Sequence, residues 1–205
     1  WRFARPGIRW RTRDTSPRAI GICVAQGARN LGVSWRQEAL VGRDGSGTGK
    51  SAPGARPPGS RFKGMKAFLD TSVLVATFYG EHEHHEPSFE LFLQQKKSTA
   101  CTAAHCLAEV YSVVTGMPGK DRASPDEALL FLRDVRERLT MLTLNEQEYF
   151  NVLRDAATAG ISGGTTYDAI VAHCALKAKA QFIYTWSLKH FTRLGPQITS
   201  RVRQP

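Results

Sequence analysis

From residue 65 onward, short apolar runs alternate with longer stretches in which apolar residues recur every three or four positions. The short runs are typical of buried strands, and the longer stretches are typical of amphipathic helices. The expected strands cover residues 66–70, 99–103, 140–144, 181–185 and, at an edge, 197–202. The expected helices cover residues 72–79, 87–97, 104–115, 124–139, 146–159, 166–179 and 188–191.

This order of elements predicts an α/β fold. Strands that are separated by helices form a parallel sheet, and the helices cover both of its faces. One helix start is marked by Ser124, Pro125 and Glu127, because serine caps a helix, proline suits the first turn and an acid suits the third position. The helix over residues 104–115 is expected to bury one face, made of Leu107, Val110, Val113 and Val114.

Asp70 ends the first apolar run and so lies at the carboxyl end of the first expected strand. In sheets of this kind, ligands and chemistry gather outside the carboxyl ends of the strands. Aspartate is depleted in strands, and a buried carboxylate is costly unless it is paired or bound to a cation. The position therefore indicates a charged partner for Asp70, and a metal ion is the first candidate.

Two further acids could join Asp70. Glu109 interrupts an apolar helical stretch, although it could also lie on the solvent face of an amphipathic helix. Asp168 follows a Gly-rich loop at the start of a mostly apolar helix, although Thr165 and Asp168 also fit a capping box. The residues alone leave both alternatives open.

The charge is divided unevenly along the chain. The formal net charge is +10, and residues 1–64 hold 13 of the 28 Lys and Arg residues but only 3 of the 18 Asp and Glu residues. That leaves 15 of each kind for residues 65–205. The basic total therefore does not predict a nucleic-acid face on the folded domain, although a neutral domain can contain a local basic patch.

Residues 1–64 are expected to form a disordered extension. They contain 11 of the 18 Gly and 5 of the 10 Pro residues and show little sustained periodicity, which is typical of segments that cannot offset their ordering entropy. The chain starts at Trp1, and the domain-like sequence starts at Met65. We therefore hypothesise that the native protein begins at Met65.

Two other interpretations of the extension are weaker. Residues 19–25 follow several arginines and could be the apolar part of a targeting signal, but the run is short and contains a glycine. Residues 44–51 resemble a phosphate-binding loop, but Asp44 replaces its first glycine and prolines follow it. A flexible Gly/Ser-rich segment is the favoured interpretation.

The cysteines and the hydropathy point to a soluble cytoplasmic protein. The four cysteines form no C-x-x-C pair and no zinc spacing, which fits reduced thiols in the cytoplasm. No apolar stretch approaches the ~20 residues that are needed to cross a bilayer.

Three motifs in the second part of the chain change the picture. They are Phe68-Leu-Asp70-Thr-Ser72, Ala108-Glu109-Val110-Tyr111, and Tyr167-Asp168-Ala169-Ile170 leading into Tyr184-Thr185-Trp-Ser187-Leu-Lys-His-Phe191. In this order and with this spacing they resemble the PIN domain, and more narrowly the VapC type of toxin from bacterial toxin-antitoxin modules. The resemblance covers residues 65–205.

The resemblance implies a three-layer α/β/α fold and a metal-dependent endoribonuclease. Asp70, Glu109 and Asp168 would be the catalytic acids and would bind Mg²⁺ or Mn²⁺. Water activated by the metal would then cleave RNA phosphodiesters. A cognate antitoxin protein would restrain the enzyme, and a homodimer is expected for the family.

One position departs from the family pattern. Ser187 stands where the family often has an acidic or other polar residue, and because serine carries no charge, a second metal is expected to bind weakly. Ser72 and Thr185 are hydroxyls that are expected to support the metal-binding acids. A rival function from another class is a binding or regulatory protein with a weak site that acts through its partner, and Ser187 is the feature that favours it.

Basic side chains near the motifs are candidates for contacts with RNA phosphates. Lys189 and Arg193 rank first because they follow Ser187. The other candidates are Lys96, Lys97 and the group Arg133, Arg136 and Arg138. An ordinary solvated helix face is favoured for the arginine group.

The histidines suggest a competing metal site. The segment Glu81-His-Glu-His-His-Glu86 is rich in metal-binding side chains. Adjacent His84 and His85 would point in different directions, which favours a solvated loop or helix start. The remaining histidines, at positions 105, 173 and 190, are not assigned to catalysis.

Overall fold

Five parallel strands form the centre of the fold in the order β3-β2-β1-β4-β5. This structure is a computed structural model, and it describes residues 64–205. The strands are β1 (Ala67–Leu69), β2 (Ala100–Ala103), β3 (Thr140–Leu142), β4 (Phe182–Tyr184) and β5 (Val202–Arg203). In the register, Ala67 of β1 pairs with Ala100 of β2 and with Phe182 of β4. The predicted parallel sheet is confirmed.

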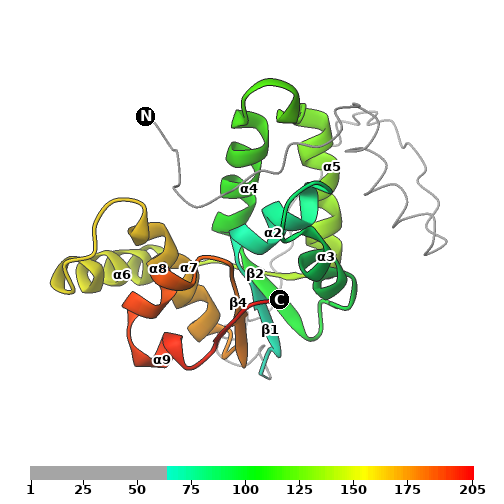
Figure 1. The fold of residues 1–205 in the computed structure, drawn as a ribbon. Helices are drawn as coiled ribbons and strands as arrows, with labels where there is room; N and C mark the ends of the chain where they lie inside the picture. Colours follow the sequence, from blue (N-terminus) through cyan, green and yellow to red (C-terminus); the bar gives the residue numbers. More distant parts are fainter. Residues whose placement is uncertain (1–63) are drawn as a thin grey trace, which may run out of the picture.

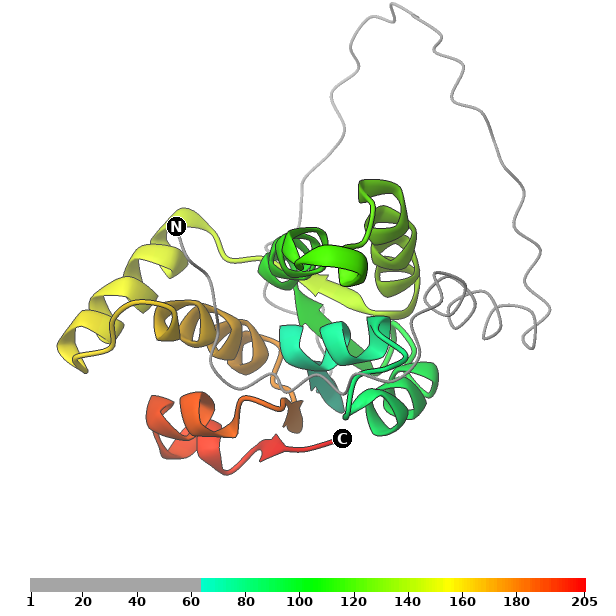
Figure 2. The ribbon, with the colours of Figure 1, turned by 45° about the horizontal axis from the view of Figure 1, so that its top comes forward.

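Helices cover the sheet on both sides, which gives three layers (Figure 1). One group is α2 (Thr71–Phe78), α3 (His85–Leu93), α4 (Ala104–Gly116) and α5 (Pro125–Arg138). The other is α6 (Glu146–Thr158), α7 (Thr165–Lys177), α8 (Leu188–Phe191) and α9 (Pro196–Thr199). The turned view in Figure 2 keeps the two groups on opposite sides of the strands. Single 3-10 turns are η2 (Gly119–Asp121) and η3 (Thr192–Leu194).

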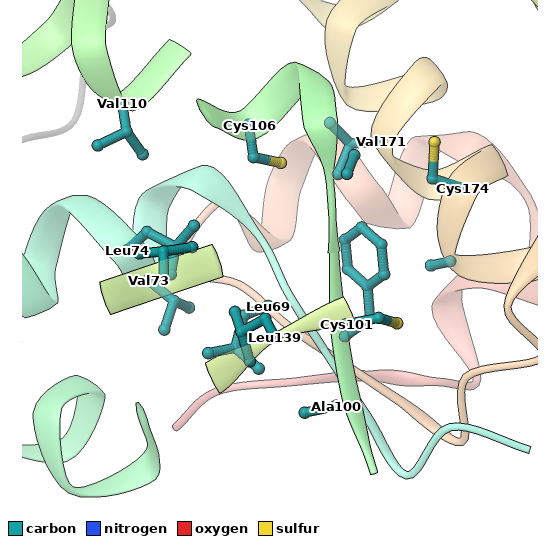
Figure 3. Packing of buried hydrophobic residues seen from close by; sticks show 14 of the residues in the cluster. Leu69, Val73, Leu74, Ala100, Cys101, Cys106, Val110, Leu139, Val171 and Cys174 are labelled. Atoms are coloured by element: carbon teal, nitrogen blue, oxygen red, sulfur yellow. The ribbon is translucent and has the colours of Figure 1, made fainter. Parts of the chain in front are cut away.

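The central strand β1 is buried along its whole length, as a strand covered on both faces must be. Phe68 and Leu69 have no exposed surface. Figure 3 shows side chains from three helices converging on β1 and β2: Val73 and Leu74 of α2, Cys106 and Val110 of α4, and Val171 and Cys174 of α7. This packing anchors the helices that carry or follow the candidate site acids.

Capping chemistry fixes two helix starts. The predicted box before α5 is confirmed: Ser124 accepts the N–H of Glu127, whose carboxylate accepts the N–H of Ser124. Asn145 and Glu148 form a second box before α6 that was not predicted. Each box satisfies backbone donors that the first helical turn leaves without a partner.

Two local predictions were wrong, and one was incomplete. The predicted apolar face of α4 does pack on the core, with Val110 and Val114 buried and Leu107 and Val113 half-buried against it, but the prediction missed the buried Cys106. Helix α3 ends at Leu93, so residues 94–97 are not helical. Residues 197–199 belong to α9 rather than to a strand, because Gly195 and Pro196 start a helix there.

Several predictions concern residues that the structure does not describe. The disordered extension, the start at Met65, the targeting signal, the phosphate-binding loop and the first cysteine lie within or depend on residues 1–63. None of the helices in residues 64–205 has the length and hydrophobicity of a membrane span. The cysteines in this part, Cys101, Cys106 and Cys174, are free and buried.

The His-rich segment forms the turn that leads into α3. His82 is buried, and its Nδ1 accepts the N–H of His84 at 3.0 Å. His85 points elsewhere, toward the Ala76 carbonyl oxygen, at 3.0 Å. Burial first, and then the charge of His84, lowers the pKa of His82 from 6.5 to about 4. His82 is therefore a neutral structural residue at neutral pH.

This pKa predicts how stability depends on pH. Between about pH 6.5 and pH 4 the unfolded chain protonates His82 while the folded protein does not, so acid lowers the free energy of unfolding. The expected loss from this residue is on the order of 2 kcal/mol. Urea unfolding of the wild type and of His82→Gln at pH 7 and pH 4.5 measures it. Equal losses in the two proteins would contradict the assignment, since the titration of the carboxylates is common to both.

Candidate active site

Asp70 lies directly after β1 and caps α2. Its side chain is 1% exposed, and its backbone N–H donates to the carbonyl oxygen of Tyr184 at 3.0 Å, which aligns the ends of β1 and β4. Its carboxylate accepts the N–H of Ser72 at 3.3 Å. Capping explains the local geometry, but it does not explain why a charge is buried this deeply.

Two hydroxyl groups hold the Asp70 carboxylate. Ser72 Oγ and Thr185 Oγ1 each donate to Asp70 Oδ2 at 2.8 Å. Each hydroxyl also accepts a backbone N–H from the segment after β4, from Trp186 and Ser187 respectively, at 2.9 Å. The network therefore links the ends of β1 and β4 and fixes the orientation of the carboxylate.

The Asp70 carboxylate has an oxygen, Oδ1, that could bind a cation. Within the described residues, its hydrogen bonds all reach Oδ2, and no Lys, Arg or His side chain forms an ion pair with it. A buried carboxylate without a cationic partner carries a large desolvation cost. Hard oxygen donors are the ligands that Mg²⁺ and Mn²⁺ take. The donor set thus fits a divalent cation at Oδ1.

Glu109 faces the same region from α4. Its Oε2 accepts a hydrogen bond from Thr71 Oγ1 at 2.5 Å, although 38 positions separate the two residues. Burial raises the pKa of the Cys106 thiol to about 12, and the charges of Asp70 and then Glu109 add to the shift. Both carboxylates therefore act on one buried thiol. Glu109 is half-buried, so it does not simply lie on a solvated helix face.

Asp168 is buried in the first turn of α7, with 2% of its surface exposed. The capping-box alternative is wrong, because α7 already begins at Thr165 and its N-cap is Gly164, with no side-chain capping bond. Oδ2 of Asp168 lies 3.2 Å from Nδ1 of His190, a residue of α8. Asp168 is therefore a site candidate rather than a cap.

His190 was not assigned to the site from the sequence. The contact with Asp168 depends on α8 folding back over the start of α7, and the two helices do pack together. The spacing of 22 residues gave no signal for it. The structure therefore places the imidazole of His190, in addition to the hydroxyl of Ser187, at the edge of the sheet where the acids lie.

All three acids lie at the carboxyl ends of the strands. Asp70 follows β1, and α4 follows β2 without a loop. Asp168 lies at the start of α7, and α7 runs back toward the beginning of β4. Asp168 also contacts α8, the helix that follows β4. Within residues 64–205, however, no three His, Cys, Asp or Glu side chains stand close enough to hold a metal ion. Carboxylates repel one another in the absence of a cation, so a bound ion would have to draw them together.

Aromatic pairs flank the acids. The rings of His84 and Trp186 stack with centroids 3.8 Å apart, and Trp186 Nε1 donates to the buried Ser88 hydroxyl at 2.9 Å. His105, one turn before Glu109, stacks on Tyr167, one residue before Asp168, at 5.2 Å. These contacts fix the segments on which the site depends.

The basic candidates next to the site are accessible. Lys189 and Arg193 are exposed on α8 and η3, one turn apart, and they follow Ser187 as expected. Ser187 is half-buried, and its backbone N–H bonds to Thr185. The role of Lys189 and Arg193 in RNA binding and the role of Ser187 at the metal site remain predictions.

The architecture is that of a three-layer α/β/α domain with acids at the carboxyl edge of its sheet, and comparison with known proteins gives the family. The PIN domain family matches residues 67–186. Ribonuclease VapC40 of Mycobacterium tuberculosis is 33% identical over 114 residues, which cover 56% of this chain and 81% of that protein. Ribonuclease VapC27 of the same organism is 30% identical over 113 residues, which cover 55% and 79%. The chain belongs to the PIN domain family and, within it, to the VapC ribonucleases.

The solved structures that this chain matches are more distant in sequence. VapBC2 from Rickettsia felis, bound to a DNA fragment from its promoter, is 17% identical with a TM-score of 0.48 and covers 68% of this chain and 98% of that chain. VapC20 of Mycobacterium tuberculosis, a toxin that cleaves the sarcin-ricin loop, is 15% identical with a TM-score of 0.49 and covers 61% and 92%.

The hydroxyl network predicts energetic coupling between Thr185 and Asp70. Thr185→Val removes a donor to the carboxylate, and we expect a loss of about 1–3 kcal/mol in the free energy of unfolding. In an Asp70→Asn background the loss should differ by at least about 0.5 kcal/mol. Chemical unfolding in the presence of chelator measures this double-mutant cycle.

Thr77→Val provides the matched control. Thr77 is equally buried, but its hydroxyl bonds to the Val73 carbonyl oxygen within α2. Its effect should add to that of Asp70→Asn within a few tenths of a kcal/mol. Equal coupling for both threonines would contradict the network.

Proposed function

We propose that this protein is a metal-dependent endoribonuclease and the toxin component of a toxin-antitoxin system. Membership of the VapC ribonucleases supports the reaction. The observation that carries the metal dependence is the buried Asp70 carboxylate, which is oriented by two hydroxyls and has no cationic side chain against it in the described residues. Asp70, Glu109 and Asp168 are the proposed catalytic and metal-binding acids.

The reaction requires the neutralisation of phosphate charge. A bound Mg²⁺ or Mn²⁺ supplies this, and it also lowers the pKa of a water molecule. The chain's own residues supply the position: Ser72 and Thr185 bond to Oδ2 of Asp70, so that Oδ1 would be available to the ion, while Thr71 bonds to Glu109. Lys189 and Arg193 would bind the RNA phosphates beside the site.

The remaining parts of the proposal concern partners and location. A cognate antitoxin protein would cover the acids, and two copies of the chain would form a homodimer. Cytoplasmic location is supported by the free, buried thiols in the described part of the chain.

A catalytically weak binding or regulatory protein is the second candidate function. Ser187 favours it, because a serine in the fourth position supplies no charge to a second metal ion.

One cleavage experiment separates the two candidates. The full chain is incubated with RNA and Mg²⁺ or Mn²⁺, with chelator, and as Asp70→Asn, and the products are sized on a gel. We expect cleavage only by the wild type with metal, and a rate at least about 100-fold lower for Asp70→Asn. Asp126→Asn, on the exposed start of α5, is the control and should cleave normally.

Cleavage that survives both chelation and Asp70→Asn would exclude the metal-dependent mechanism. No cleavage of any RNA by a folded wild type would favour the binding protein.

A further inference from the structure

Cations gather at the edge of the sheet that lies opposite the acids. All five strands are parallel, so the loops that enter them meet at this amino edge. In Figure 1 the connection from α3 to β2 lies at this edge, away from α2 and α4. We define the basic row as the cations in the loops that enter β2, β1, β4 and β5, namely Lys96, Lys97, Lys66, Lys179 and Arg201.

Hydrogen bonds place these loops side by side. The N–H of Lys66 donates to the carbonyl oxygen of Thr99 at 2.8 Å, next to Lys96 and Lys97. The carbonyl oxygen of Lys66 accepts the N–H of Phe182 at 3.1 Å, three positions after Lys179. Nη1 of Arg201 donates to the carbonyl oxygen of Ala180 at 2.5 Å. The cations therefore follow one another in the order of the strands.

The basic row has no compensating charge in its own loops. None of its members forms an ion pair with a described residue, and the four lysines are exposed. Residues 94–99, 178–181 and 200–201 contain no Asp or Glu. Residues 65–205 are formally neutral, and five of their 15 cations belong to the row.

The backbone at Lys179 is also unusual. Among the described residues it is the one non-glycine residue with positive φ, at 53°. Glycine or asparagine fits this end of a helix with less strain. Lysine stands at this position although the backbone conformation favours glycine or asparagine.

We infer that the basic row binds the backbone phosphates of RNA at a surface separate from the acids. The row crosses four neighbouring strands, roughly 15 Å at ~4.8 Å between strands, which suits a run of phosphates better than a single one. The choice of RNA as the polyanion rests on the proposed ribonuclease function. Lys189 and Arg193 are proposed to bind phosphates beside the acids, and the basic row would bind phosphates further along the same RNA.

Binding measured without cleavage tests the inference. The full chain is titrated in chelator onto a fluorescent 30-nucleotide single-stranded RNA at several KCl concentrations. The row variant is Lys66→Gln/Lys97→Gln/Lys179→Gln. The control variant is Lys120→Gln/Arg133→Gln/Arg136→Gln, which removes three exposed cations that form no ion pair with a described residue. Residues 1–64 are the same in both, so their cations cancel in the comparison.

We expect the row variant to bind the RNA about tenfold more weakly at 100 mM KCl. The slope of log K against log salt should become shallower by about 2, because each lost phosphate contact on a single strand contributes about 0.7. The control variant should change the Kd less than about threefold. Equal losses in both variants would overturn the inference, as would no loss in the row variant. A loss of binding to a 30-base-pair DNA duplex with RNA binding intact would overturn the assignment to RNA.

The result is independent of the cleavage experiment. A failure of the proposed function appears as absent cleavage with metal, whatever the binding. A failure of the inference appears as unchanged RNA affinity in the row variant, while the wild type still cleaves RNA.

Discussion

The structure depends on one costly feature, a carboxylate buried at the end of the central strand. Asp70 follows a strand without exposed side chains, and its desolvation must be offset. Two hydroxyls and a backbone N–H offset part of the cost, but they supply no positive charge. The buried carboxylate needs hydrogen-bond donors, which explains the positions of Ser72, Thr185 and the segment after β4. A divalent cation is the partner that the donor set fits, and we propose that the acids on α4 and α7 complete its site.

The parallel sheet separates charge across the domain. Helix starts after β1 and β2, and the start of α7, bring acids to the carboxyl edge, while the strand-entering loops bring lysines and an arginine to the amino edge. A neutral total is therefore compatible with site acids at one edge of the sheet and a row of cations at the other. For an enzyme that acts on a polyanion, one surface would concentrate cations for the reaction and the other would hold the substrate.

Much of this could be predicted from the sequence, because strand and helix signals from residue 65 onward are local. The capping box at Ser124 and the run that ends at Asp70 are read from a few neighbouring residues. The contact of His190 with Asp168 and the bond from Thr71 to Glu109 join positions far apart, and they depend on how helices pack. The role of Asp168 was ambiguous for the same reason: a cap and a buried site acid share one local pattern, and burial distinguishes them.

The central claim is that Asp70, Glu109 and Asp168 act together on one divalent cation. Calorimetric titration of the full chain with Mn²⁺ tests it most directly, using Asp70→Asn, Glu109→Gln, Asp168→Asn and the three pairwise combinations. The account predicts one tight site in the wild type, a large loss of affinity in each single variant, and little further loss in the pairs, because a shared site is already broken. Unchanged Mn²⁺ affinity in any single variant, or losses that add independently, would contradict it.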